Sequence, residues 1–83
     1  MAKPCDPIQC NSEGLEFFAK GDPSAAHALL RRAYSGMPEE AGILVNLGLA
    51  LMQQGLVDQA ERSYRLALRS QELRVRRSAA KNL

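Results

Sequence analysis

Hydrophobic residues recur along most of the chain at the three- and four-residue spacing of an amphipathic α-helix. The segment "SAAHALLRRAY", residues 24–34, shows this spacing clearly. The strict alternation of a half-buried β-strand does not persist anywhere in the sequence. The hydrophobic pattern therefore predicts an all-α fold.

Glycine, proline and acidic residues divide the pattern into separate helices. Asp22-Pro23 is typical of an N-cap followed by proline in the first helical turn, and Gly21 suits the end of the preceding helix. Acidic residues at 39–40 favour the start of a third helix, because negative charge is stabilising there. A fourth helix is expected to begin near Asp58. The other breakers are Gly36, Pro38 and Gly55. A final segment, about residues 71–83, predicts a fifth helix.

The helix around "ILVNLGLALM", residues 43–52, has almost no polar face. An ordinary surface helix buries one apolar stripe and keeps an opposite polar face. We therefore expect contacts on more than one side of this helix.

The sequence repeats itself at an offset of 34 residues. Segment 14–21, GLEFFAKG, aligns with segment 48–55, GLALMQQG. The further aligned pairs are Ala26 with Ala60, Leu30 with Tyr64 and Ala33 with Ala67. Such a period indicates repeated helix–turn–helix units. We expect repeat one at about residues 7–40, repeat two at about 41–74 and the extra helix after them, all in a single domain over 1–83.

With this period the chain resembles the tetratricopeptide repeat family. The residues that stand in the family pattern are Gly14, Phe17, Gly21, Ala26, Leu30, Ala33 and Pro38 in the first copy, and Leu44, Leu47, Gly48, Leu51, Gly55, Ala60, Tyr64 and Ala67 in the second. Cys10 and Glu13 depart from it, because the family prefers large apolar residues there. Glu72 stands where the family usually has proline, so the fourth helix either continues into the fifth or turns less sharply.

Small residues in both copies predict close helix contacts, since they let antiparallel helices approach. Gly48 is expected to meet Ala60, as Gly14 meets Ala26. In the same helix, the side chains expected to face the partner helices are Leu44, Leu47 and Leu51.

The resemblance implies that the first helix of each repeat lines a concave groove. Its predicted partner-binding residues are Leu15, Phe18, Val45, Asn46, Leu49 and Met52, flanked by Asn11, Ser12, Ala19 and Gln53. Asn46 either serves as a polar handle for a ligand or forms a hydrogen bond within the stack. The apolar floor is covered by a partner, by the chain's own last helix or by another subunit.

One subset of the family clamps a carboxylate with several basic and amide side chains. Asn46 and Arg76 match that subset, but Asn11, Leu15 and Ala80 stand where it has Lys, Asn and Arg. The resemblance therefore does not favour a carboxylate clamp.

Composition and charge exclude several other classes of protein. Residues 41–83 hold seven basic and three acidic side chains, concentrated in "RSQELRVRRSAAK". We interpret this run as a solvated helix face, because no aromatic residues alternate with the arginines as nucleic-acid binding would favour. The apolar run at 43–52 is shorter than the about 20 residues that cross a bilayer, and residues 1–10 show no secretory pattern. We expect a cytoplasmic protein.

The sequence shows no arrangement that predicts catalysis, a cofactor or a metal site. His27 is the only histidine and is expected on the solvent-exposed convex side. Cys5 and Cys10 are expected to be a reduced pair. The predicted function is a protein–protein interaction module that binds a peptide or helix in the groove. The alternative is a self-associating assembly module that uses the same groove or the open end of the stack.

Overall fold

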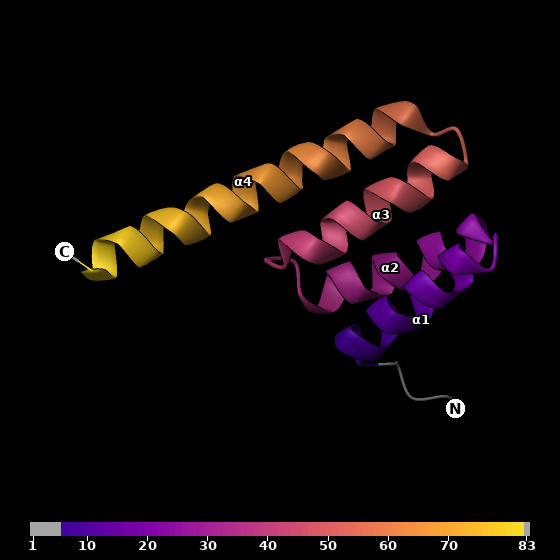
Figure 1. Cartoon of the computed structure of the whole chain (residues 1–83), viewed down its shortest axis with the longest axis horizontal. Helices are drawn as coiled ribbons and strands as arrows, with labels where there is room; N and C mark the ends of the chain where they lie inside the picture. The colour runs from indigo at the N-terminus through magenta and orange to yellow at the C-terminus, as the bar shows by residue number, and fades with distance from the viewer. Residues whose placement is uncertain (1–5, 83) are drawn as a thin grey trace.

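The computed structural model describes the backbone of residues 6–82 and the side chains of residues 6–73. Four helices account for nearly all of this range and no strand occurs in it (Figure 1). The helices are α1 Pro7–Ala19, α2 Pro23–Gly36, α3 Ala41–Gln53 and α4 Val57–Asn82. The all-α fold class is confirmed.

The helices stack in chain order. α1 packs against α2, α2 against α3, and α3 against α4, while α1 also contacts α3. Short turns join each helix to the next, so consecutive helices run in opposite directions (Figure 1). Within the described residues α4 contacts no helix other than α3.

Two Asp-Pro pairs begin the helices of the first repeat. Asp22 Oδ1 accepts a hydrogen bond from the Ala25 N–H at 3.2 Å, as the sequence predicts. Asp6 Oδ1 accepts one from the Ile8 N–H, also at 3.2 Å, and Pro7 follows it in the first turn. Each carboxylate thereby satisfies a backbone donor that has no partner within its helix.

A left-handed glycine ends the first helix of each repeat. Gly21 has φ 83° and Gly55 has φ 79°. After Gly21, the Asp22 N–H donates to the Phe17 carbonyl at 2.9 Å, and the equivalent bond after Gly55 is also 2.9 Å long. This is the pattern of a Schellman cap, which needs a residue without a Cβ at the left-handed position.

The core is mainly aliphatic and lies between successive helices. One cluster joins α2 to α3 and α4 through Ala26, Leu30, Leu47, Ala50, Leu51 and Ala60. A second joins α1, α2 and α3 through Cys10, Ala33 and Ile43. The prediction that Leu44, Leu47 and Leu51 face partner helices is confirmed, because all three are buried. Burial of α3 on these sides explains the near absence of polar residues in the run at 43–52.

Gly48 makes a close contact with α4, but its nearest neighbour differs from the one expected. A Cβ built on Gly48 would lie 2.5 Å from Cε1 of Tyr64, and the next two atoms also belong to that ring. The predicted first neighbour, Ala60, is therefore wrong. The repeat supplies the reason: a Cβ on Gly14 would lie 2.8 Å from Leu30, the residue 34 positions before Tyr64.

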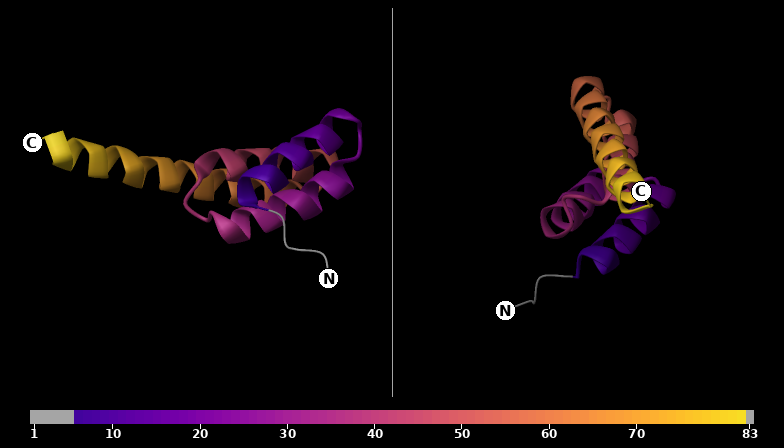
Figure 2. Two further views of the ribbon diagram at one scale, coloured as in Figure 1. Left: turned by 90° about the horizontal axis from the view of Figure 1, so that it is seen from below. Right: turned by 90° about the vertical axis from the view of Figure 1, so that its left-hand side faces the viewer.

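The segment predicted as a separate fifth helix is the second half of α4. Residues 71–82 continue α4 without a break, and this corrects the expectation of an extra element. The chain contains neither glycine nor proline after Gly55, and Glu72 replaces the family's proline, so nothing interrupts the backbone hydrogen bonds. With about 1.5 Å per residue, α4 is about twice as long as α3. Its C-terminal half extends beyond the other helices (Figure 2).

Cys10 is fully buried and disulfide-bonded. The expectation of a reduced pair is therefore wrong. Cys5, the other cysteine of the sequence, lies outside the described residues. None of the described helices is both long enough and apolar enough to cross a membrane.

Candidate functional site

Four of the predicted groove residues are large apolar side chains that remain substantially exposed. Leu15 on α1 is 40% exposed, and on α3 the exposed fractions are 40% for Val45, 41% for Leu49 and 48% for Met52. The three α3 residues recur at four- and three-residue spacing, so they form a single stripe on that helix. We call these four residues the apolar floor.

Phe18 differs from the apolar floor in its burial. Its side chain is half-buried and packs against the larger core cluster. It is the repeat equivalent of Met52, which is the most exposed of the four floor residues. Phe18 therefore belongs partly to the core and supports the floor from below.

Asn46 forms a hydrogen bond within the helical stack. Its Nδ2 donates to Oδ1 of Asn11 at 3.0 Å, and both side chains are half-buried. The bond joins α3 to α1 and fixes the spacing of the two helices that carry the floor. Of the two predicted roles for Asn46, the bond within the stack is confirmed, while contact with a ligand stays a prediction.

The last helix does not cover the apolar floor within the described residues. α4 packs on α3 and makes no contact with α1. Around the floor, Asn11 is half-buried, and the exposed flanking residues are Ser12, Ala19 and Gln53. The floor is thus open to a molecule outside the described chain.

His27 is not the solvent-exposed residue that the sequence predicts. It is half-buried, and its Nδ1 lies 3.0 Å from Oε1 of Gln54 at the end of α3. The expectation was wrong because position 27 lies on the face of α2 that packs toward α3. The histidine therefore takes part in a contact between the two repeats.

These features can be compared with known proteins. A family model described as tetratricopeptide repeat matches residues 17–81, which is more than half of the chain. The chain belongs to the tetratricopeptide repeat family. No curated protein and no solved structure matches it. Tetratricopeptide repeats generally mediate protein–protein interaction and are generally not catalytic.

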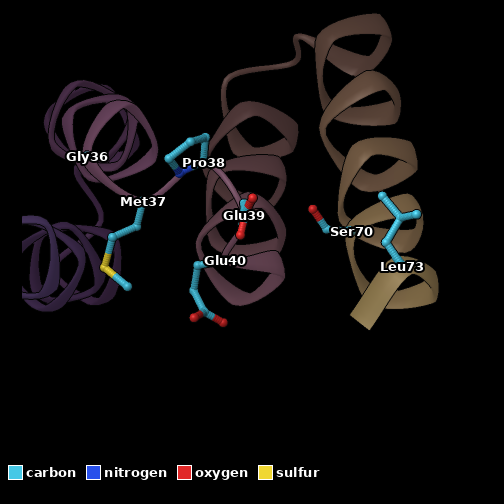
Figure 3. Close-up of a pocket in the computed structure, with 7 residues that line it drawn as sticks. All are labelled: Gly36, Met37, Pro38, Glu39, Glu40, Ser70 and Leu73. Atoms are coloured by element: carbon cyan, nitrogen blue, oxygen red, sulfur yellow. The ribbon is translucent and has the colours of Figure 1, made fainter. Parts of the chain in front are cut away.

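This tetratricopeptide repeat chain carries a second hollow that the sequence did not indicate. A cavity of about 520 Å³ lies between the α2–α3 turn and the middle of α4 (Figure 3). Its lining residues are Gly36, Met37, Pro38, Glu39, Glu40, Ser70 and Leu73. Ser70 and Leu73 reach this position only because α4 continues without a break. The missing glycine or proline after residue 55 was the signal available in the sequence.

Two other types of site can be compared with the repeat geometry. Of the carboxylate-clamp positions, Asn11 is bonded to Asn46 and Leu15 belongs to the apolar floor. The side chains of Arg76 and Ala80 lie outside the described ones. Among the residues that the structure describes, no three His, Cys, Asp or Glu side chains are grouped so that they could hold a metal ion.

Proposed function

We propose that this tetratricopeptide repeat chain binds an apolar peptide or helix of a partner protein on the apolar floor. One observation carries the proposal: four large apolar side chains from α1 and α3 are 40–48% exposed and the described part of α4 leaves them uncovered. Contiguous exposed apolar residues on a soluble domain are typical of an interaction site.

The stripe on α3 indicates how a partner segment would lie. Val45, Leu49 and Met52 follow one line along the helix, and Leu15 on α1 forms the opposite side. A helix or an extended segment placed between α1 and α3 would contact both. Since each floor residue is already about half-buried, covering one of them gains only part of the about 1.5–3 kcal/mol for full burial of such a side chain. Several anchors are therefore needed together.

The Asn46–Asn11 pair lies among these apolar residues and supports the same use. The bond holds α1 and α3 at a set separation, so the floor is formed before a partner arrives. A preformed site loses less conformational entropy on binding. The amide groups of the pair that are not used in their mutual bond are available to a partner's backbone.

A selection from a library of displayed peptides tests this proposal for any partner sequence. Peptides selected on the wild-type chain are titrated against Leu49→Glu and, as a matched control, Leu66→Glu on α4, whose leucine is similarly exposed. We expect Leu49→Glu to weaken binding at least about tenfold, or about 1.4 kcal/mol, because a carboxylate would be buried without a partner. Leu66→Glu should bind normally.

Circular dichroism accompanies the titration, because the interpretation requires folded variants. A folded Leu49→Glu variant that binds the selected peptides as well as wild type contradicts the assignment. So does a Leu49→Glu variant that loses its helix signal, because Leu49 would then belong to the core.

Self-association is the second candidate function. Val57 and Leu68 on α4 are 50% and 61% exposed, and they lie at the end of the stack where no further helix packs in the described chain. Two copies could meet through this end or through the apolar floor.

A further inference from the structure

One face of α4 corresponds to the face of α2 that is covered by α3. On α2, Leu30 belongs to the core cluster that includes Leu47 of α3, and Tyr34 packs against the cluster that includes Ile43. The equivalents of Leu30 and Tyr34, 34 residues later, are Tyr64 and Leu68. Tyr34 is half-buried, whereas Leu68 is 61% exposed, because no helix packs there in the described chain.

The exposed residues beside Leu68 have opposite charges. Arg65 precedes Leu68 by three residues and Glu72 follows it by four, so all three lie on one face of the helix. Both charged side chains are exposed. The centre of this surface is therefore apolar, with a positive charge on one side along the helix axis and a negative charge on the other. We call these three residues the α4 face.

The other end of the same molecule is unsuited to cover the α4 face. A second copy stacked head to tail would present α1 as α3 is presented to α2. The α1 equivalents of Ile43 and Leu47 are Gln9 and Glu13, whose side chains are hydrogen-bonded to each other at 3.2 Å. Placing a carboxylate where a buried leucine packs is costly. Continued stacking of copies is thereby disfavoured.

We propose that two copies of this chain pair through the α4 face, with their α4 helices antiparallel about a two-fold axis beside Leu68. This inference deepens the second candidate function, self-association, and does not depend on the apolar floor. Midway between Arg65 and Glu72 lies position 68–69, so an axis there sets Arg65 of each copy opposite Glu72 of the other. The two leucines meet between the two ion pairs.

The charge pattern selects a second copy in this orientation as the occupant. A parallel pair would set Arg65 against Arg65 and Glu72 against Glu72, which repel each other. The proposed axis also lies within about one residue of the midpoint of α4, Val57–Asn82, so the two helices overlap along nearly their whole length. The extended half of α4 is free of the other helices in its own copy (Figure 2). Each copy offers the same surface, as a closed two-fold dimer requires.

Sedimentation equilibrium of the whole chain over a wide range of concentration tests the pairing. Wild type should approach twice the 9.1 kDa mass of the monomer. Leu68→Glu should weaken the dimer at least about tenfold, since it places two carboxylates together at the centre of the interface. Leu66→Glu is the matched control, because it lies about 200° around the same helix, and it should dimerise normally. Circular dichroism verifies that each variant is helical.

Charge reversal tests the register. Arg65→Glu and Glu72→Arg should each weaken the dimer, because each sets like charges opposite one another across the axis. An equimolar mixture of these two variants should associate again as a mixed dimer, and the double variant should form a homodimer. A general loss of stability would not be reversed by mixing.

Several outcomes would overturn the proposal. These are a wild-type chain that stays monomeric at all concentrations, a helical Leu68→Glu variant that still dimerises, and charge-reversed variants that do not associate when mixed. Loss of the dimer in Leu49→Glu but not in Leu68→Glu would move the contact to the apolar floor. A monomeric wild type whose selected peptides require Leu68 would assign the α4 face to a different protein. Failure of peptide binding on the floor leaves this test unaffected, so the two proposals can fail separately.

Discussion

Gly48 and the ring of Tyr64 pack so closely that no side chain can be added between them. The contact crosses from α3 to α4 and repeats the contact of Gly14 with Leu30 in the first pair of helices. Glycine in a helix interior costs about 1 kcal/mol relative to alanine. The structure offsets this cost by close packing of α3 on α4, so Gly48 is required by its neighbour on α4 and not by its own backbone conformation.

Replacement of Gly48 should therefore destabilise the fold. Gly48→Leu overpacks the contact with Tyr64 and should lower the free energy of unfolding by about 1–3 kcal/mol or more. Gly42 provides the control, since a Cβ there would meet nothing within 4 Å. Gly42→Leu should leave stability unchanged or raise it, because leucine is the better helix former. Thermal unfolding followed by circular dichroism measures both, and equal midpoints for wild type and Gly48→Leu would contradict the close contact.

At the scale of the helix, α3 presents buried and exposed leucines close together in sequence. Leu47 is 8% exposed and lies in the core cluster, whereas Leu49 is 41% exposed and belongs to the apolar floor. Two residues along a helix correspond to a rotation of about 200°. The helix therefore separates a core face from a binding face although both consist of leucine.

The same substitution at these two positions should have opposite effects on folding. Leu47→Glu buries a carboxylate without a partner, a cost of several kcal/mol in a chain that is only marginally stable, and should remove most of the helical signal. Leu49→Glu places the carboxylate at the surface and should retain it. Far-ultraviolet circular dichroism distinguishes them. Similar loss of helix in both variants would place Leu49 in the core.

α4 is the element that departs most from the family pattern. Glu72 occupies the position of the usual proline, and the helix continues for ten residues past it, to Asn82. This continuation forms one wall of the cavity beside the α2–α3 turn and supplies the length for the proposed antiparallel pairing.

Introduction of the family's proline should shorten α4. In Glu72→Pro the ring removes a backbone donor and clashes with the preceding turn, a cost of about 3 kcal/mol within a helix. We expect lower ellipticity from loss of the C-terminal segment, a smaller change in the unfolding midpoint of the remaining helices, and a weaker dimer. Glu72→Ala is the control for the backbone effect and should keep the full ellipticity. An unchanged ellipticity in Glu72→Pro would show that α4 does not depend on continuous backbone hydrogen bonds there.

At the scale of the whole molecule, two surfaces face outward from one small helical stack. The apolar floor lies on α1 and α3, and the α4 face lies at the end of the stack. The two surfaces share no residue, so a dimer formed through α4 leaves the floor open to a partner. A dimer would then present two floors, and a partner with two binding segments would bind more tightly through multivalency.

Dimerisation should also appear in the stability of the molecule. Association stabilises the folded state by mass action, so the unfolding midpoint of the wild type should rise with protein concentration. The midpoint of Leu68→Glu should not depend on concentration. Thermal unfolding at several concentrations provides the measurement. A wild-type midpoint that is constant over the range in which sedimentation detects dimer would contradict the coupling.

The sequence by itself determined the all-α class, the two 34-residue units and the ends of most helices. These features depend on local signals: helical hydrophobic spacing, the Asp22-Pro23 cap, and the left-handed glycines at 21 and 55. The family pattern also identified which side chains of α3 are buried, because a helix of known orientation separates its faces by spacing alone. Each of these signals acts within a few residues of the position that it specifies.

Only the tertiary structure decided which distant residues meet. It selected Tyr64 for Gly48, Asn11 for Asn46 and Gln54 for His27. Such contacts join positions 16 to 35 residues apart, so they depend on the angles and separations of packed helices and not on local spacing. The continuous α4 had the same consequence: local spacing predicted helix on both sides of Glu72, but the position of Leu73 beside the α2–α3 turn required the packed structure.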